Sequence, residues 1–413
     1  MRAWPEIYVP QLSSKFSFAP LSLLNTATQR VEALPIKPLY RMYVCGITPY
    51  DATHLGHAAT YLTFDLIHRY LKATGSEVRF VQNITDIDDP LLARAARDGI
   101  DWEVLANSQI DLFRSDMTNL HVLPPQHYVG VVEAMPLVIE SILTLQESET
   151  TYTVENDLYF RIHSDAEFGT RSHYTDEQML SIFAERGGDP TRAGKEDAFD
   201  ALLWLAQREG EPGWPSPFGM GRPGWHIECT AIALEYLGTS ITIQGGGSDL
   251  IFPHHEMCAA QGEVMNGQSF AKYFMHTGMI GYQGEKMSKS KGNLVFVSKL
   301  REAGIDSMAI RLALLANHYR SDREWDDLLL TNATKRLERW RKGFAKPEGP
   351  EIAQTISGVI DALNNDLDTT AALAHLDAWV EKAIADSSSD KDAKLANTGS
   401  LARFVDAVLG VAI

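Results

Sequence analysis

The sequence predicts an α/β fold with a parallel sheet, a domain inserted into that fold and a helical C-terminal part. Three observations lead to this prediction. Residues 39–125 read as strand, helix, strand and helices in turn, and this β-α-β order implies parallel strands. Residues 126–207 interrupt the pattern with polar, glycine-containing segments, and residues 208–300 resume it. From residue 301 onward, apolar side chains recur at helical spacing.

The first half of the predicted core follows an N-terminal extension, residues 1–38, in which prolines separate short apolar runs. We expect strands and loops in this extension. Within residues 39–125 the predicted elements are a strand at Tyr43–Gly46, a helix at Leu55–Ala73, a strand at Glu77–Asn83 and helices between Asp89 and Leu120.

The predicted inserted domain, residues 126–207, separates the two halves of the core. It contains an amphipathic helix at Val131–Thr144 and a short strand near Asp157–Ile162. Several prolines then lead back to the second half, residues 208–300. Its predicted elements are a helix at Ile227–Leu237, a strand at Ser240–Gln244, a helix at His254–Val264 and a strand at Phe274–Ile280.

The C-terminal part divides into a helical stem, residues 301–346, and a helical domain, residues 347–413. The domain has 11 acidic against 4 basic residues, so it offers no basic stripe that could hold an RNA stem. The predicted helices are Ile305–Tyr319, Trp325–Lys342, Ser357–Asn365, Thr369–Ile384 and Leu395–Val411.

Composition and charge limit the class of protein. A net charge of −17 argues against a large nucleic-acid partner, since such binding depends on Lys and Arg contacts to phosphates. No apolar run approaches membrane-spanning length, and the N-terminus has no apolar signal core. Three widely spaced cysteines do not form a disulfide pattern and fit a reducing compartment. We therefore expect a cytoplasmic protein without a membrane partner.

Residues 43–61 read as a strand, a turn with glycine and proline, and a helix that begins near His54. Such a helix start presents backbone N–H groups and a positive dipole end, which suit a phosphate. His54 and His57 can donate to phosphoryl oxygens, while Gly56 lets a flat ring approach the backbone. The same residues also fit a solvated helix start, so this pattern alone leaves both interpretations open.

A second motif, Lys-Met-Ser-Lys-Ser at residues 286–290, changes that balance. The two motifs together resemble the HIGH and KMSKS pair of class I aminoacyl-tRNA synthetases, in which a nucleotide and an amino acid react above a Rossmann sheet. The resemblance implies a Rossmann-like class I catalytic core with an inserted connective domain and a C-terminal helical bundle, and ATP with Mg²⁺ as a substrate. Further runs resemble the cysteinyl branch: Tyr-Val-Cys-Gly from residue 43, Asn-Ile-Thr-Asp-Ile-Asp-Asp from 83, Gly-Trp-His-Ile-Glu-Cys from 224 and Gly-Gly-Gly-Ser-Asp-Leu-Ile-Phe-Pro-His-His-Glu from 245.

The three cysteines lie in separate segments, and His254 and Cys258 share one face of a predicted helix. Thiolates and imidazole suit zinc, although scattered cysteines are more often small buried residues. In the cysteinyl-tRNA synthetases, the residues that match Cys45, Cys229 and His254 bind a zinc whose open position takes the substrate thiol. The resemblance implies one Zn²⁺ per chain, which would distinguish cysteine from serine. The synthetases have Glu at the position of Cys258, so a fourth ligand stays open.

A glycine loop with an acidic residue, residues 245–249, lies between a predicted strand and a predicted helix. Such a loop suits adenosine, although an ordinary turn would look similar. The resemblance assigns Gly247 and Asp249 to the ribose and Trp225 to the aminoacyl-adenylate. It also assigns to this pocket residues from strand ends and from the first motif: Cys45, Gly46, Ile47, Thr48, Gly56, Thr60, Asn83, Ile84, Thr85, Ser248 and Ile280.

The catalytic residues implied by the resemblance are His54, His57, Lys286 and Lys289. They would stabilise negative charge on the phosphates while the amino-acid carboxylate attacks the α-phosphorus. Electrostatic stabilisation of this kind lowers a barrier by several kcal/mol. Lysines on a loop are usually only solvated, and the first motif is what favours a catalytic role here.

Two acceptors for the activated cysteine remain. One is tRNA, as in a cysteinyl-tRNA synthetase, and the other is the amine of glucosaminyl-inositol, as in the ligases of mycothiol biosynthesis. Glu-Arg-Gly-Gly-Asp-Pro at residues 185–190, the basic Lys291 where the synthetases tend to have Leu, and the lack of an anticodon module resemble the ligases, over nearly the whole chain. An inactive scaffold is a third interpretation, which the intact His and Lys motifs disfavour.

The ligase interpretation predicts the partners of the chain. These are small molecules, namely ATP, L-cysteine and glucosaminyl-inositol, with no nucleic acid, and the chain is a monomer or dimer. Residues 185–190 are expected to line a small polar pocket, where carboxylates and Arg186 hydrogen-bond the hydroxyls of the sugar.

Overall fold

A five-stranded sheet forms the centre of the molecule in the computed structural model, which describes the chain except residues 14–15, 288–291, 347–348 and 386–394. Its strands are ordered β11-β10-β3-β4-β5, and every neighbouring pair is parallel. The predicted parallel sheet is therefore confirmed. The strands are β3 (Leu39–Val44), β4 (Glu77–Ile84), β5 (His127–Gly130), β10 (Ile241–Gly247) and β11 (Ala271–Thr277).

Helices cover both faces of this sheet. Met42 and Val44 of β3 belong to the hydrophobic cluster that contains α1 (Leu55–Ala73), and α1 has the predicted bounds. Tyr43 and Cys45 belong instead to the cluster that contains helix α6. Successive side chains of a strand point to opposite faces, so the apolar run of β3 fills two separate cores. Helices α6 (Trp225–Leu237) and α7 (Glu256–Asn266) lie in the second cluster.

β3 and β10 lie side by side, with Val44 opposite Gly245. From β3 the chain continues to β4 and β5 on one side, whereas from β10 it continues to β11 on the other. Doubly wound sheets bind ligands at the carboxyl ends of the strands where this order reverses. The residues that follow β3 and β10 therefore lie where such a fold takes its ligands.

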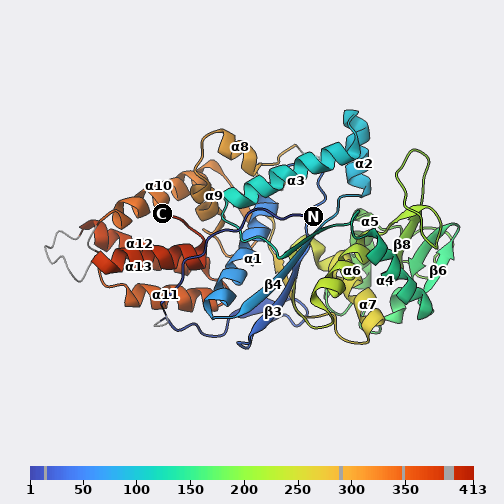
Figure 1. The fold of residues 1–413 in the computed structure, drawn as a ribbon, viewed down its shortest axis with the longest axis horizontal. Helices are drawn as coiled ribbons and strands as arrows, with labels where there is room; N and C mark the ends of the chain where they lie inside the picture. The colour runs from blue at the N-terminus through green and yellow to red at the C-terminus, as the bar shows by residue number, and fades with distance from the viewer. Residues whose placement is uncertain (14–15, 288–291, 347–348, 386–394) are drawn as a thin grey trace.

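A second, antiparallel sheet of order β6-β7-β8-β9 lies between β5 and α6 in the chain, and Figure 1 shows it at one end of the molecule. β5, at the start of the predicted insertion, pairs with β4 of the core, and β9 lies immediately before α6. The residue bounds predicted for the separate domains stay predictions. The segment contains α4 (Met135–Glu147), β6 (Thr151–Val154), β7 (Asp157–Phe160), α5 (Asp176–Glu185), β8 (Ala201–Ala206) and β9 (Gly221–Pro223).

One predicted strand, Phe274–Ile280, is wrong as a single element. The chain leaves β11 at Thr277 and enters a different sheet, of order β13-β12-β14, at Ile280. At Gly278 between them a Cβ would lie 2.6 Å from the backbone of Ser321, so the chain turns against another segment. The strands of this small sheet are β12 (Ile280–Tyr282), β13 (Glu285–Lys286) and β14 (Arg323–Trp325).

The C-terminal helices gather at the end of the molecule opposite to the antiparallel sheet (Figure 1). They bury Trp340 and Trp379, and α13 lies against α1, where Nη1 of Arg69 donates to the carbonyl of Asp406 at 2.9 Å. The predicted helical C-terminal part is confirmed. Its helices are α8 (Val297–Glu302), α9 (Ser307–Leu314), α10 (Asp327–Phe344), α11 (Ala353–Asn364), α12 (Thr369–Ala385) and α13 (Leu395–Leu409).

The remaining elements lie around the core, and among the described residues none is a helix both long and apolar enough to span a bilayer. The predicted strands of the N-terminal extension form a hairpin, and the helices predicted between Asp89 and Leu120 are present as α2 and α3. These elements are β1 (Ser22–Asn25), β2 (Arg30–Ala33), α2 (Asp89–Asp98) and α3 (Trp102–Asn119).

Candidate active site

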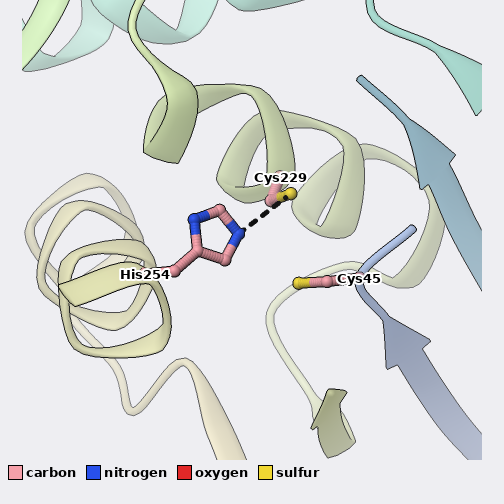
Figure 2. A group of neighbouring side chains, drawn as sticks. All are labelled: Cys45, Cys229 and His254. Atoms are coloured by element: carbon pink, nitrogen blue, oxygen red, sulfur yellow. Dashed lines mark hydrogen bonds between the residues drawn. The ribbon is translucent and has the colours of Figure 1, made fainter. Parts of the chain in front are cut away.

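Two cysteines and a histidine from three segments converge at the carboxyl ends of β3 and β10 (Figure 2). Cys45 directly follows β3, Cys229 lies on α6, and His254 lies in a single π-helical turn before α7. One ligand atom of each lies within 4.8 Å of the other two, and all three residues are buried. The Sγ of Cys229 is 3.3 Å from Nε2 of His254. The fold thus brings together the three residues that the resemblance assigns to a metal.

The chemistry of this cluster fits zinc. Burial acts to raise the pKa of Cys229, but the neighbouring thiols of Cys258 and Cys45, together with His254, outweigh burial and hold that pKa well below its usual value. Burial and the neighbouring Cys229 raise the pKa of Cys45. Zn–S bonds of about 2.3 Å and Zn–N bonds of about 2.0 Å can meet at one point between atoms this close. A thiolate, a second thiol and an imidazole are donors that zinc prefers.

The turn after β3 is shaped by the neighbouring strand β4. The backbone N–H of Gly46 donates to Oδ1 of Asn83 at 2.8 Å, and a Cβ at position 46 would lie 1.7 Å from the carbonyl oxygen of Asn83. Nδ2 of Asn83 donates to Oγ1 of Thr85 at 3.2 Å, and the backbone N–H of Thr85 donates to the carbonyl of Ile47 at 3.1 Å. Only glycine fits at position 46, and the four residues form one connected group.

His54 and His57 stack on each other where α1 begins, with ring centroids 3.7 Å apart. His54 is the N-cap of α1, and its Nδ1 accepts from the backbone N–H of His57 at 3.4 Å. A Cβ on Gly56 would lie 2.9 Å from the ring of His54, so glycine makes room for this arrangement. Both imidazoles therefore lie at the positive end of a long helix, which suits a phosphate.

Asp249 lies beside the end of β10. A Cβ on Gly247 would lie 2.5 Å from Oδ1 of Asp249 and 3.9 Å from Oγ1 of Thr60, which places these three residues together. Oγ1 of Thr60 is in turn 2.8 Å from Oγ1 of Thr277, the last residue of β11. Ser248 begins the short 3₁₀ turn that follows β10. A carboxylate and a hydroxyl in this arrangement suit the hydroxyls of a ribose.

Trp225, the first residue of α6, stacks on His254 with ring centroids 4.3 Å apart. The indole therefore lies against the Cys/Cys/His cluster. The other predicted pocket residues are less informative. Thr48 accepts a backbone hydrogen bond from Tyr50 at 2.9 Å, and Ile47, Ile84 and Ile280 are buried in the cluster that contains α1. Their contact with a ligand stays a prediction.

Of the two lysines of the second motif, the structure describes the backbone of one. Lys286 is the last residue of β13, which pairs it with Gly281, while Lys289 lies outside the described residues. The chain that leaves this motif is tied to the start of α1, since backbone hydrogen bonds of 2.9 and 3.0 Å join residues 53–55 to residues 295–297. The chain that follows the motif therefore lies beside the turn that carries His54.

Comparison with known proteins identifies the family. The model of the family described as tRNA synthetases class I (C) catalytic domain matches residues 35–335. An L-cysteine:1D-myo-inositol 2-amino-2-deoxy-alpha-D-glucopyranoside ligase of Thermomonospora curvata is 54% identical over 417 residues, 100% of both chains. The ligase of the same name from Gordonia bronchialis is 53% identical over 418 residues, again 100% of both chains. The chain belongs to this ligase family.

The fold of this ligase family member agrees with a solved synthetase. Methionyl-tRNA synthetase of Mycobacterium tuberculosis, solved in complex with methionyl-adenylate, matches it with a TM-score of 0.62 at 16% identity, over 90% of each chain. Identity this low concerns the fold alone. The predicted class I catalytic core, with its α/β architecture, is confirmed.

Three histidines around the Cys/Cys/His cluster were not singled out from the sequence. Nδ1 of His226 lies 3.0 Å from Nδ1 of His254, and Nε2 of His255 lies 3.3 Å from Sγ of Cys45. His276 continues the chain of contacts, since its Nε2 is 2.7 Å from Nδ1 of His255. Burial lowers the pKa of His226 and His255 well below the usual value, and that of His276 to about 3. Such neighbours orient metal ligands. The adjacency of His226 to Trp225 and of His255 to His254 in the motifs was the available signal, whereas His276 lies outside the motifs.

Cys258 lies next to the cluster without joining the three-residue group. Its Sγ is 3.7 Å from Nε2 of His254, one helical turn away as the spacing predicts, and 3.4 Å from the carbonyl oxygen of His226. Burial and the neighbouring Cys229 raise the pKa of its thiol. Among the residues that the structure describes, the group whose ligand atoms all lie within 4.8 Å of one another contains only Cys45, Cys229 and His254. This geometry favours a three-residue site with Cys258 as its neighbour.

Proposed function

We propose that the protein is an ATP-dependent, AMP-forming ligase that joins L-cysteine to the amine of glucosaminyl-inositol (1D-myo-inosityl 2-amino-2-deoxy-alpha-D-glucopyranoside) in mycothiol biosynthesis. One observation carries the proposal: a buried Cys/Cys/His cluster, the His54–His57 stack and the Asp249 loop share one edge of a parallel sheet. That edge can hold a thiol, a phosphate and a ribose together. The full-length ligase relatives support glucosaminyl-inositol as the acceptor.

Selection of cysteine falls to the metal-binding residues. Cys45, Cys229 and His254 would hold one Zn²⁺, which supplies a soft Lewis acid for the thiolate of the substrate. Serine is nearly the same size as cysteine, so shape alone discriminates poorly between them. The ring of Trp225 stacks on His254 and therefore lies beside the cluster.

In the first step, an oxygen of the cysteine carboxylate attacks the α-phosphorus of ATP, the bond from that phosphorus to the bridging oxygen breaks, and pyrophosphate leaves. His54, His57 and the positive end of α1 stabilise the charge on the phosphate oxygens, and Asp249 binds the ribose. We assign the same stabilising role to Lys286 and Lys289, with Mg²⁺ accompanying the ATP.

In the second step, the amine of the acceptor attacks the acyl carbon of cysteinyl-adenylate. The carbon–oxygen bond to AMP breaks, AMP leaves with the bonding pair, and the amine nitrogen loses a proton. An acyl phosphate anhydride is consumed and an amide forms, so the free energy of ATP cleavage drives this transfer.

The acceptor is tested by incubating the enzyme with ATP and labelled cysteine, and adding either glucosaminyl-inositol or tRNA. We expect AMP release to rise with glucosaminyl-inositol, with label recovered on the aminosugar, and to be indifferent to tRNA. The acidic residues 347–413 support this expectation, because they would repel an RNA stem. Label recovered on tRNA, with none on the aminosugar, would favour the alternative, a cysteinyl-tRNA synthetase.

The surroundings of the enzyme are part of the proposal. Cys45, Cys229 and Cys258 are buried and form no disulfide, which fits a reducing compartment such as the cytoplasm. We propose that it acts there as a monomer or dimer on small molecules, without nucleic acid.

A further inference from the structure

Residues 249–256 connect β10 to α7 and carry two functional groups of the proposed site. Asp249 lies beside Gly247 at the end of β10, and His254 belongs to the metal-binding cluster. The segment consists of a 3₁₀ turn and a π-helical turn, and Phe252 within it has extended backbone angles. Such irregular backbone lacks a continuous hydrogen-bond ladder, so its shape depends on contacts from elsewhere.

Arg186 of the antiparallel domain supplies such contacts. Its Nη1 donates to the carbonyl oxygens of both Asp249 and Phe252. The Glu-Arg-Gly-Gly sequence explains its position: α5 ends at Glu185, Gly187 takes a φ of +87°, and a Cβ on Gly188 would lie 2.5 Å from the ring of Phe183. The two glycines therefore end the helix tightly and leave the Arg186 side chain directed at residues 249–252.

This use of Arg186 differs from the expectation that residues 185–190 bind the sugar. The guanidinium is engaged by backbone carbonyls of the core. Asp189 is also engaged within the domain, since it accepts from the hydroxyl of Tyr159 and pairs with Lys195 at 2.9 Å. We do not assign these two side chains to the acceptor.

The same domain holds the rest of the segment. The ring of Phe252 packs against Phe168 and Phe199, whose centroids lie 6.2 and 6.1 Å from its own and 5.8 Å from each other. At the far end, the buried carboxylate of Glu256 pairs with Arg171 at 3.0 Å and accepts from the backbone N–H groups of residues 169 and 172 at 2.9 and 2.8 Å. The inserted domain therefore holds the segment at both ends, through Arg186 near Asp249 and through Arg171 and the backbone of residues 169 and 172 at Glu256.

We propose that Arg186 is a positioning residue for nucleotide binding, which fixes the backbone of Asp249 so that its carboxylate meets a ribose hydroxyl. The proposal rests on the proposed function, since it takes Asp249 as the ribose ligand. A guanidinium bonded to two carbonyls three residues apart restrains the turn between them. Without it, Asp249 keeps its carboxylate but loses the defined position beside Gly247 and Thr60.

The test is ATP–pyrophosphate exchange by the full chain with ATP, 2′-deoxy-ATP and 3′-deoxy-ATP. We expect the wild type to lose about tenfold or more in kcat/KM when the bound hydroxyl is missing. In Arg186→Ala we expect kcat/KM for ATP to fall about tenfold, mainly through KM, while the value for that deoxy analogue hardly changes. In Arg186→Ala, discrimination between ATP and the deoxy analogue that lacks the bound hydroxyl should therefore nearly vanish. Arg186→Lys, which keeps one donor group, should lie between the two enzymes.

The control is Arg161→Ala. Arg161 is another arginine of the same domain whose Nη1 donates to two backbone carbonyls, those of Glu149 and Thr151 at 3.0 and 2.6 Å, away from the nucleotide loop. It should retain wild-type discrimination, and zinc content should match the wild type in all variants.

Three outcomes overturn the proposal. An equal loss with all three nucleotides in Arg186→Ala would mean a merely structural role. A wild type that accepts both deoxy analogues as well as ATP would remove Asp249 as the ribose ligand. A wild type with no exchange at all would overturn the proposed function, and this proposal with it; the first two outcomes leave the proposed function standing.

Discussion

The turn after β3 and the segment after β10 form two sides of one site, yet they are held in different ways. The turn after β3 is bonded to β4, which lies close in sequence: Gly46 and Asn83 are 37 residues apart. The segment after β10 is bonded to the antiparallel domain: Arg186 and Asp249 are 63 positions apart in the chain, and Arg171 and Glu256 are 85 positions apart. The first side is built by the core itself, and the second side is built jointly with the insertion.

This difference indicates that the inserted domain helps to hold the segment after β10. The side that we propose binds phosphate needs a strand, a glycine and a capped helix, all of which the β-α-β unit provides. The side with Asp249 and His254 has irregular backbone and relies on Arg186, Arg171 and their neighbours. Substitutions in the insertion should therefore affect ribose recognition and stability, whereas substitutions after β3 should affect phosphate chemistry.

The largest expected effect concerns the cluster that joins both sides. Cys229→Ala should remove the bound zinc and abolish cysteine-dependent exchange, because the cluster then keeps only one thiol and one imidazole. Metal analysis of the purified protein measures the zinc directly. Cys258→Ala is the matched control and should retain one zinc per chain; loss of zinc there as well would make Cys258 a fourth ligand. Intact wild-type protein without zinc would refute the site.

The next largest effect tests the residues proposed to stabilise the phosphates. Lys289→Ala should lower ATP–pyrophosphate exchange by about 10²-fold or more, because it removes a charge proposed to stabilise the transition state. Zinc content should be unchanged. Lys299→Ala on α8 is the control, since Lys299 is exposed and pairs only with Glu302 among the ion pairs of the described residues. Near-normal exchange in Lys289→Ala would show that the motif is misassigned.

A stability measurement tests whether the inserted domain stabilises the segment after β10. Glu256→Gln should lower the free energy of unfolding by about 2–3 kcal/mol, because it neutralises a carboxylate that is 0% exposed and paired with Arg171. Urea unfolding followed by fluorescence gives this value. Glu302→Gln, at an exposed ion pair, should leave the midpoint unchanged. Equal midpoints for the two variants would mean that the core holds residues 249–256 without the insertion.

The matching test on the other side of the site concerns the bond between β4 and the turn after β3. Asn83→Ala should cost about 1–2 kcal/mol of unfolding free energy, since it leaves the partly buried N–H of Gly46 without its 2.8 Å acceptor. Discrimination between ATP and its deoxy analogues should be retained, because Asn83 does not contact Asp249 in any hydrogen bond that the structure records for it. Loss of that discrimination in Asn83→Ala would contradict the separation of the two sides.

The smallest effect depends on pH. Burial raises the pKa of Asp88, the N-cap of α2, to about 6. A raised pKa means that the folded protein disfavours the carboxylate, so the contribution of this group to stability is fully present below about pH 4 and is lost as the pH rises through 6. Asp88→Asn keeps a capping side chain and should be more stable than the wild type by about 1–2 kcal/mol at pH 8. Urea midpoints at pH 5 and 8 should show a smaller difference at pH 5; a pH-independent difference would contradict the shifted pKa.

Much of the fold could be predicted because local patterns specify it. The bounds of α1 follow from its helical periodicity, and the parallel sheet follows from the β-α-β order. The trio Cys45, Cys229 and His254 was also predictable, through the resemblance of its motifs. Ile280 shows the limit: Phe274–Ile280 reads as one strand, but contacts of Gly278 with residues near 321 divide it between two sheets. A contact that distant leaves no local signal.

The sequence by itself determined the α/β class and singled out the candidate residues of the helix start and of the Cys/Cys/His cluster, because each depends on residues near one another in the chain or on a complete motif. Only the tertiary structure decided the work of Arg186, Glu256 and His255, whose partners are Asp249, Arg171 and Cys45. An arginine in a polar loop and a glutamate at a helix start are ordinarily solvated, and their burial against irregular backbone depends on how two domains pack. Packing of this kind joins residues far apart in the chain, and no pattern within either segment records it.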